Sequence, residues 1–320
     1  MLILNETEIR SLVDAAAART VVADAFRALH RGEATLPPPV SVGFRSPNGL
    51  AHIKAGHLHR DTVWTVKVAT DFETSDGGSM THDGVMLVIS AVDGALACVL
   101  LDNGYLTNLR TGAAGAVAAD LLARDDAATA AIVGAGNQAR FQLEALLQVR
   151  PIASVRVAAR NRARAQEFVS EVEERWRLRA QLCETVEEAV RGADVVVTTT
   201  ASEAPLLQAA WLENGVHVTA VGSDEPTKQE LATDVLARAD VVAVDDQSQA
   251  ARLGELHHAL DDGSVDPADV VTIGELLDEA RPGRREPDDV TVADLTGVGV
   301  QDAAIAALVM RAATRSAPAL

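Results

Sequence analysis

A glycine-rich turn near the middle of the chain constrains the fold more than any other feature of the sequence. A strand-like run, the turn GAGNQA and a helical pattern follow one another in residues 130–147. Gly134 permits a tight turn, Gly136 lets the backbone approach a pyrophosphate, and Ala139 allows close packing of helix on strand. The start of the helix favours an anion through its unpaired N–H groups and its dipole. We therefore predict dinucleotide binding at Gly134, Gly136, Asn137, Gln138 and Ala139.

Strand-like and helical patterns alternate around this turn up to about residue 290. The strand-like runs are continuously apolar, as in DVVVTTT, VHVTAVG and DVVAVDD. Runs of this kind indicate parallel strands that are buried on both faces. The pattern predicts an α/β protein with a Rossmann-type doubly wound parallel sheet in residues 113–290.

The strand that follows the turn bears on the choice of cofactor. NAD-binding folds usually place an acidic residue at its end for the ribose 2′-hydroxyl, whereas NADP-binding folds use a nearby arginine. This strand ends in VAARNRARA, without Asp or Glu. Arg160, Asn161 and Arg162 therefore favour NADP(H) over NAD(H). The alternative interpretation is a solvent-exposed basic helix start.

The first 110 or so residues have a different pattern of predicted secondary structure. A helical pattern in residues 6–32 is followed by strand-like runs at 41–45, 50–56, 63–69 and beyond. Successive strands without helices favour an antiparallel or mixed sheet. The end of the chain reads as a strand, a glycine-containing turn and an apolar helix that could return to this region. We predict an α+β domain of residues 1–112 with 291–320.

Two of the three lysines of the chain lie thirteen residues apart in the predicted strands. If residues 51–70 form a hairpin that turns at Arg60 and Asp61, Lys54 lies directly opposite Lys67. Like charges so placed repel and destabilise a sheet. An anion between the two lysines would explain the pair, whereas the alternative is chance placement on a solvated surface.

Composition excludes several classes of function. A formal net charge of −18 argues against nucleic acid or an anionic membrane as a partner. Cys98 and Cys183 are too few for a disulfide framework or a zinc site, and the histidines lack metal-ligand spacing, so no metal site is expected. The start MLILNETEIRSLV is unlike a signal peptide, and no apolar run reaches about 18 residues. We expect a cytoplasmic protein.

Two further residues are candidates for chemistry. Arg110 is predicted near a helix start that Thr107 caps, where a guanidinium can grip a carboxylate through two hydrogen bonds, or it is an ordinary surface arginine. Asp224 is predicted just beyond the carboxyl end of a strand, where open α/β sheets bind ligands. The alternative for Asp224 is a helix N-cap near Pro226.

The motifs, taken in order, resemble the ornithine cyclodeaminase/mu-crystallin family. The similar segments are LLDNGYLTNLRTGAAGAVAA, VGAGNQARFQLEAL, AVGSDEPTKQEL, LGELHHAL and VADLTGVGVQD, from about residue 50 to 310. Within the family they are most similar to the ectoine-utilisation protein C branch and also resemble imine-reducing members such as iminosuccinate reductase.

The resemblance implies a homodimer whose N-terminal domain supplies the dimer contact and the substrate-binding groups. It implies NAD(H) or NADP(H) as cofactor and small amino acids or their imines as substrates. By this resemblance Asp224 would be the acid/base, and Lys67 would bind substrate. Separately, neighbouring cations could lower the pKa of Lys67 enough for it to share the proton transfer. The residues expected to hold the substrate carboxylate are Arg45, Lys67 and Arg110, and those expected to face the cofactor are Thr81, Thr111 and Thr296.

One departure from the family pattern bears on the substrate. Ornithine cyclodeaminases have a glutamate thirteen residues before the lysine, where this sequence has Lys54. A cation there disfavours a dibasic substrate, because desolvated like charges cost several kcal/mol. The sequence therefore predicts an imine reductase or amino-acid dehydrogenase that acts on a small imino or amino acid. A cyclodeaminase with internally recycled NAD and a non-catalytic NADPH-binding protein are the alternatives.

Overall fold

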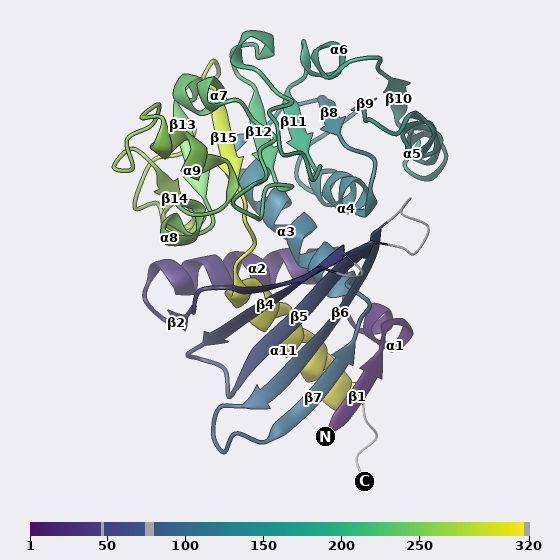
Figure 1. Cartoon of the computed structure of the whole chain (residues 1–320), viewed down its shortest axis with the longest axis vertical. Helices are drawn as coiled ribbons and strands as arrows, with labels where there is room; N and C mark the ends of the chain where they lie inside the picture. The colour runs from purple at the N-terminus through teal and green to yellow at the C-terminus, as the bar shows by residue number, and fades with distance from the viewer. Residues whose placement is uncertain (46–47, 74–79, 317–320) are drawn as a thin grey trace. The chain divides into compact units, whose positions relative to one another are not determined.

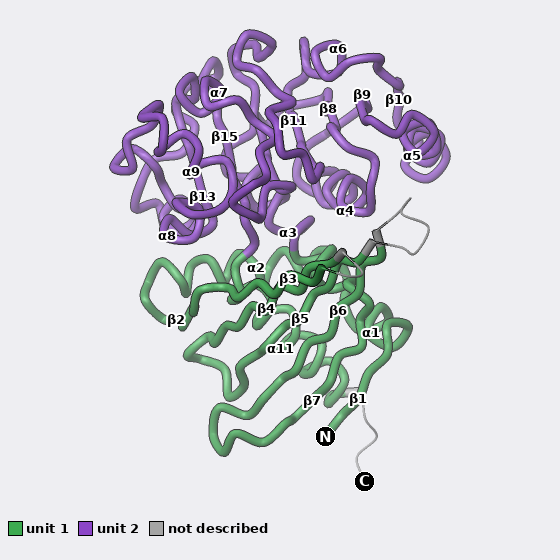
Figure 2. Tube along the Cα trace, viewed as in Figure 1, with its two compact units in different colours: residues 1–110, 298–320 green, residues 111–297 purple. Residues whose placement is uncertain are grey.

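The computed structural model describes residues 1–45, 48–73 and 80–316. The chain divides into two compact units (Figure 2). Unit 1 comprises residues 1–110 and 298–320, and unit 2 comprises residues 111–297. Among the described residues, no helix combines the length and the apolar character needed to cross a membrane.

Unit 1 is built on a seven-stranded mixed sheet (Figure 1). The order is β1-β7-β6-β5-β4-β2, and β3 also pairs with β4. Only β1 runs parallel to its neighbour, so the predicted mixed sheet is confirmed. The strands are β1 Leu2–Asn5, β2 Ala34–Thr35, β3 Val40–Arg45, β4 Asn48–Leu58, β5 Val63–Glu73, β6 Met80–Ser90 and β7 Leu96–Leu101.

Three helices complete unit 1, together with the first residues of α3. The helix predicted near the start is two helices, α1 Glu6–Leu12 and α2 Ala15–His30, because Asp14 leaves helical geometry and caps α2. The C-terminal helix α11, Gly299–Ser316, packs on β4, β5 and α2. Its predicted return to the first region is confirmed.

The contact of α11 with the sheet is close. A Cβ added at Gly299 would lie 2.0 Å from the Ala55 carbonyl oxygen, and one at Gly56 would lie 2.4 Å from the Gly299 carbonyl oxygen. Only glycine at both positions lets the start of α11 approach the backbone of β4. The residues that follow Gly299 are thereby brought against the sheet.

Unit 2 contains an eight-stranded sheet in which every pair is parallel. The order is β10-β9-β8-β11-β12-β15-β13-β14, which reverses direction between β8 and β11. This confirms the predicted Rossmann-type fold, and the reversal is where such folds bind ligands. The strands are β8 Thr129–Val133, β9 Ser154–Ala158, β10 Arg179–Leu182, β11 Val195–Thr198, β12 His217–Ala220, β13 Val241–Val244, β14 Val271–Thr272 and β15 Thr291–Asp294.

Both faces of this sheet are buried. Val195 and Val197 of β11 pack in one hydrophobic cluster, whereas Val196 packs in the other. Short helices connect the strands, and α3 begins in unit 1 and continues into unit 2. The helices are α3 Tyr105–Leu122, α4 Asn137–Leu146, α5 Arg162–Arg175, α6 Val186–Val190, α7 Thr233–Arg238, α8 Gln247–Ala250, α9 Gly254–Asp261 and α10 Ile273–Leu277, with the 3₁₀ turn η1 Ala209–Trp211.

The predicted domain boundaries need correction at both ends of unit 2. Residues 291–297 were expected to belong with the N-terminal region, but β15 pairs with β12 on one side and β13 on the other. All four residues of β15 are buried, as a central strand requires. These residues therefore belong to unit 2, which begins at Thr111 rather than at residue 113.

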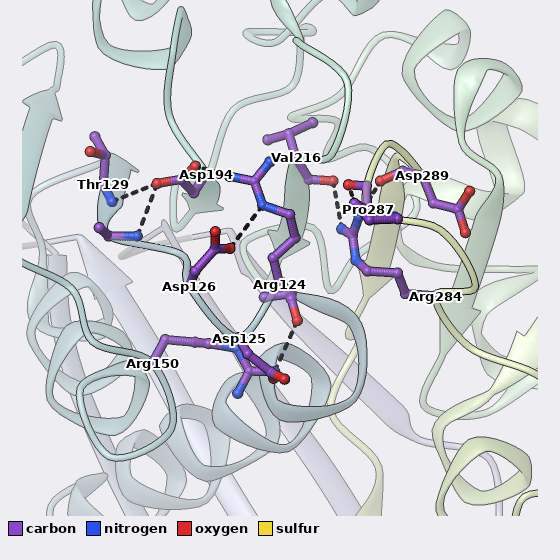
Figure 3. Close-up of polar contacts among 12 residues, drawn as sticks. Arg124, Asp125, Asp126, Thr129, Arg150, Asp194, Val216, Arg284, Pro287 and Asp289 are labelled. Carbon is purple, nitrogen blue, oxygen red and sulfur yellow. Dashed lines mark hydrogen bonds and ion pairs between the residues drawn. The ribbon is translucent and has the colours of Figure 1, made fainter.

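Three arginines lie at the amino-terminal edge of the parallel sheet, and each is paired (Figure 3). Arg124 forms an ion pair with Asp194, whose Oδ2 atom also accepts two backbone N–H bonds at the start of β8. Arg150 and Arg284 donate to carbonyl oxygens at the C-terminal end of α3, at 2.9 and 2.7 Å. Cations at a helix C-terminus are favourable, so this cluster is structural.

Candidate functional site

The predicted register of the two lysines is confirmed. Lys54 on β4 is the direct partner of Lys67 on β5. Neither lysine lies on a solvated surface, because their exposed fractions are 6 % and 2 %. The lysine-bearing face of β5 is the one that is buried inside the unit, whereas Val66 on the opposite face is only partly buried.

A carboxylate that the sequence analysis did not assign binds both Lys67 and Arg110. The Oδ1 atom of Asp302 accepts a hydrogen bond from Lys67 Nζ at 3.0 Å and another from Arg110 Nε at 3.0 Å. Arg110 Nη1 also donates to Gln301 Oε1 at 3.0 Å. The motif VADLTGVGVQD contains Gln301 and Asp302, and the need of buried cations for a counterion could have indicated that an acid was missing, but not that it was Asp302.

Burial and charge change the ionisation of this cluster. Burial, Arg110 and Lys54 lower the pKa of Lys67 to about 7, against the opposing effect of Asp302. Burial acts to raise the pKa of Asp302, but Lys67 and Arg110 outweigh it and hold that pKa below its usual value. Lys67 can therefore exchange a proton near neutral pH, while Asp302 stays ionised.

A second carboxyl group lies at the start of α3. The Oδ2 atom of Asp102 accepts a hydrogen bond from the Leu106 backbone N–H at 2.7 Å. Burial raises the pKa of Asp102 to about 6, and Lys67 opposes this rise. Thr107 is therefore not the cap that we predicted, and Arg110 lies in the second turn of the helix, so its anion-binding role cannot rest on the helix terminus.

Several polar atoms around the cluster are open to a ligand. Lys67 and Arg110 share the single oxygen Asp302 Oδ1. Among the described residues, the buried Oδ2 of Asp302, Nε2 of Gln301 and Oγ1 of Thr65 have no hydrogen-bond partner. Unsatisfied polar atoms are costly in a protein interior. A bound anion with further polar groups would satisfy them.

Two predicted residues of unit 1 lie elsewhere. Arg45 is exposed at the end of β3, where it pairs with Asn48. That position is six residues along β4 from Lys54, about 20 Å in an extended strand, so the structure does not bring Arg45 to the cluster. Thr81 is exposed on β6, and its hydroxyl donates to the Phe72 carbonyl oxygen at 3.1 Å.

The glycine turn of unit 2 fits a dinucleotide phosphate. Gly134 has φ of +112°, and a Cβ there would lie 2.4 Å from Thr199 Oγ1. Gly136 is the N-cap of α4 without a side-chain cap, and a Cβ there would meet no atom within 4 Å. Asn137 begins the helix, and Ala139 is fully buried against the sheet. The helix N-terminus is thus open where a phosphate would approach.

An arginine that we did not predict supports this turn. Arg140 Nη1 donates to the carbonyl oxygens of Ala135 and Gly136, each at 3.1 Å. Its Nε atom donates to Glu171 Oε2 at 2.6 Å. Arg140 therefore fixes the backbone of the turn rather than offering its charge to a ligand.

The residues after β9 have unequal roles. Asn161 caps α5 by accepting the Arg164 N–H at 3.1 Å. Arg162 is engaged by Glu184 through both terminal nitrogens. Arg160 is exposed, and no side-chain partner is found for it in the described part of the chain. Arg160 is therefore the residue that favours NADP(H).

Asp224 follows β12 by four residues in a segment without helix, so the N-cap alternative is wrong. Its Oδ1 atom accepts a hydrogen bond from Lys228 Nζ at 2.7 Å, and Lys228 also pairs with Glu225 at 2.6 Å. Burial acts to lower the pKa of Lys228, but the two carboxylates raise it overall. Lys228 is therefore a permanent counterion of Asp224.

The two predicted threonines of unit 2 are partly engaged by protein. The Thr111 carbonyl oxygen accepts a hydrogen bond from Gln142 Nε2 at 2.9 Å. The buried Thr296 hydroxyl donates to Asp245 Oδ1 at 2.9 Å and accepts from Gln249 Nε2 at 2.8 Å.

A Rossmann-type unit with an open phosphate turn, combined with an α+β unit that holds a buried cationic cluster, defines a two-domain protein of the dinucleotide-binding class. The chain belongs to the ornithine cyclodeaminase/mu-crystallin family, whose sequence model matches residues 1–316. This confirms the predicted resemblance.

Individual relatives match over nearly the whole chain. It is 42 % identical to an uncharacterized cyclodeaminase of Sinorhizobium fredii, covering 100 % of this chain and 98 % of that protein. An archaeal alanine dehydrogenase dimer with bound NAD superposes with a TM-score of 0.91 at 36 % identity, over 98 % of this chain and 96 % of that one. Thermococcus litoralis Δ(1)-pyrroline-2-carboxylate reductase, solved with NADH and L-proline, superposes with a TM-score of 0.93 at 25 % identity, over 98 % of both chains.

Proposed function

We propose that the protein is an NAD(P)H-dependent oxidoreductase that acts on the C=N or C–N bond of a small imino or amino acid. The observation that carries this proposal is the buried pair of Lys67 and Arg110, which share one oxygen of a single carboxylate, Asp302, with Lys54 directly opposite Lys67. The α-carboxylate of an amino or imino acid would supply a further acceptor for Lys67 and Arg110.

The cluster can orient a substrate as well as bind it. Arg110 has one of its nitrogens on Asp302 and another on Gln301, which fixes the plane of its guanidinium. A carboxylate held by a fixed guanidinium and an ammonium group has little rotational freedom. Such positioning brings the adjacent carbon into reactive geometry and carries much of the catalysis in hydride transfer.

The cofactor would be held by the turn of unit 2. Gly134, Gly136 and the first residues of α4 would bind its phosphates, and Arg160 would bind a 2′-phosphate, which makes NADP(H) our preferred cofactor. When bound, the nicotinamide supplies or accepts the hydride.

Two residues are candidates to move the proton at nitrogen. Lys67 has a pKa of about 7, close to the value that suits a general acid at neutral pH. Asp224, which the family resemblance implicates, is held by Lys228. The altered ionisation of Lys67 supports it as the donor to an imine, and Asp224 remains the second candidate.

The relatives support this class of reaction and leave the substrate open. Those named above include an alanine dehydrogenase, an imino-acid reductase and a cyclodeaminase. Lys54 is buried opposite Lys67, which favours a substrate with a neutral or acidic side chain over ornithine. The role in ectoine catabolism remains a prediction from the motifs.

The exposed face of the sheet in unit 1 supports a homodimer. Ala55, Val66, Leu87, Val99 and Ile3 form a continuous row across five strands by direct pairing. These apolar side chains are only partly buried, and Ile3 is 57 % exposed. Contiguous apolar surface of this kind marks interaction sites. Light scattering of the purified protein should give twice the mass of the chain.

A cofactor absorbance assay tests the proposed activity. The purified protein is given NADPH or NADH with pyruvate and ammonia, with a cyclic imino acid, or with ornithine. Steady loss of reduced cofactor with an imine supports the proposal. Ammonia release from an amino acid without net absorbance change would instead show a cyclodeaminase, and tight cofactor binding with neither reaction would show a binding protein.

A further inference from the structure

Asp302 joins the two cations Lys67 and Arg110 of unit 1 through hydrogen bonds. Lys67 Nζ and Arg110 Nε share a single oxygen, Asp302 Oδ1, at 3.0 Å each. A carboxylate needed only for neutralisation could give one oxygen to each cation. Here the second oxygen, Oδ2, is buried and has no hydrogen-bond partner among the described residues.

The position of Asp302 is determined by the fold. It lies in the first turn of α11, whose start contacts the backbone of β4 through Gly56 and Gly299. Gln301 beside it accepts from the Val298 N–H at 3.2 Å and from Arg110 Nη1. Asp302 is 1 % exposed, so its carboxylate has little freedom to follow a moving lysine.

We propose that Asp302 is a positioning residue that fixes the Lys67 ammonium and the Arg110 guanidinium relative to each other and keeps Lys67 protonated as the proton donor of the reaction. This inference rests on the proposed function, because it concerns the same substrate-binding cluster.

The ionisable groups around Lys67 act in opposite directions. Arg110 and Lys54, together with burial, favour the neutral amine, whereas Asp302 favours the ammonium both by its charge and by its hydrogen bond. Asp102 also interacts electrostatically with Lys67. Of these groups, Asp302 is the one with a direct hydrogen bond to Lys67 Nζ.

The proton step balances with a reduced nicotinamide as hydride source. The C=N π bond is lost, a C–H bond forms from the hydride, and an N–H bond forms with the proton of Lys67. Lys67 becomes a neutral amine and regains a proton from solvent. The imine is reduced by two electrons, which a bound reduced nicotinamide would supply.

The test uses Asp302→Asn, which keeps a bridging carbonyl oxygen and removes the charge. Lysine ε-carbon NMR is suitable because the chain has only three lysines, so the Lys67 signal can be assigned with Lys67→Met. The Lys67 titration midpoint should fall by about one pH unit or more in Asp302→Asn. The matched control is Asp61→Asn, which removes another carboxylate that contacts α11, through Arg311 at 3.1 Å. This control should leave the midpoint unchanged.

The outcomes separate the inference from the proposed function. An unchanged Lys67 midpoint in Asp302→Asn would overturn the inference whatever the substrate. If Asp302→Asn does not fold, the Lys67 midpoint is measured in Asp302→Glu instead. The longer side chain displaces the carboxylate relative to Lys67, so the midpoint must move. An unchanged midpoint in Asp302→Glu contradicts the proposed role of Asp302. With a substrate that is turned over, the alkaline fall in kcat should move to lower pH by the same amount without a rise in KM. If the Lys67 midpoint shifts but the protein reduces no imine, the positioning role of Asp302 is supported and the proposed reaction is refuted.

Discussion

The two units each contain three basic side chains gathered in one place, and the two clusters differ in how their charge is satisfied. In unit 2, Arg124, Arg150 and Arg284 donate to aspartates and to backbone carbonyl oxygens (Figure 3). In unit 1, Lys67 and Arg110 share one oxygen of one carboxylate, and Lys54 adds a third charge beside them.

The difference separates structural from ligand-binding cations. The arginines of unit 2 have many protein acceptors, so removing one should loosen the fold and leave ligand binding alone. In unit 1, Lys67 and Arg110 share one carboxylate oxygen, so removing either should abolish recognition of an anion. Four experiments address this contrast.

Lys67→Met should have the largest effect. We expect kcat to fall by about 10²–10⁴-fold, because the variant loses both a carboxylate contact and a proton donor. The affinity for NADPH, measured by fluorescence titration, should stay the same because the phosphate turn belongs to unit 2. Equal loss of turnover and of NADPH affinity would contradict the assignment of separate roles to the two units.

Arg150→Met should show the opposite behaviour. Arg150 donates to three carbonyl oxygens and is 6 % exposed. Its replacement should lower the free energy of unfolding by about 3 kcal/mol, measured with urea, while the folded fraction keeps its kcat. Exposed Arg164 on α5 provides the control, since Arg164→Met should change neither quantity. A loss of kcat in Arg150→Met without a loss of stability would contradict the structural role assigned to the arginines of unit 2.

The buried lysine should make stability depend on pH in a specific direction. In the folded protein the pKa of Lys67 is about 7, whereas that of an unfolded lysine is about 10.4, so the unfolded chain binds more protons between these values. Stability should therefore rise from pH 7 to pH 10 in the wild type relative to Lys67→Met, by at most about 1.4 kcal/mol per pH unit. If the free energies of unfolding of the two proteins, measured with urea, change with pH in parallel, the pKa of Lys67 is not perturbed.

The same contrast applies on a smaller scale after β9. Arg162 is paired with Glu184, whereas Arg160 has no partner among the described residues. Arg160→Ala should weaken NADPH binding by about tenfold and leave NADH binding unchanged, because only NADPH carries a 2′-phosphate. Arg162→Ala should leave the ratio of the two affinities as it is. An unchanged ratio in Arg160→Ala would remove the preference for NADP(H).

Local patterns predicted much of this molecule. The register of Lys54 and Lys67 follows from one turn position, because hairpin pairing is fixed once the turn is known. The turn at Gly134 joins a strand to a helix that follows directly in the chain, so residues close in sequence determine its structure. The boundary at β15 was misjudged because a strand between two others gives no local sign of which sheet it joins.

The parts that were missed depend on residues far apart in sequence. Asp302 contacts Lys67 across 235 residues, and no spacing rule links them. Arg110 was given a helix-terminus role because the start of α3 was placed too late, whereas the helix begins at Tyr105 and Asp102 accepts the Leu106 N–H of its first turn. A count of charges could have indicated that the cationic residues needed a partner, but not which acid would supply it.

The central claim is that the cationic cluster of unit 1 binds the carboxylate of the substrate. A crystal structure of the protein with NADP⁺ and L-proline or pyruvate tests it most directly. We predict that the carboxylate oxygens lie within hydrogen-bond distance of Lys67 Nζ and the Arg110 guanidinium. A carboxylate held by other residues, with Lys67 and Arg110 still contacting only Asp302 and Gln301, would contradict the account.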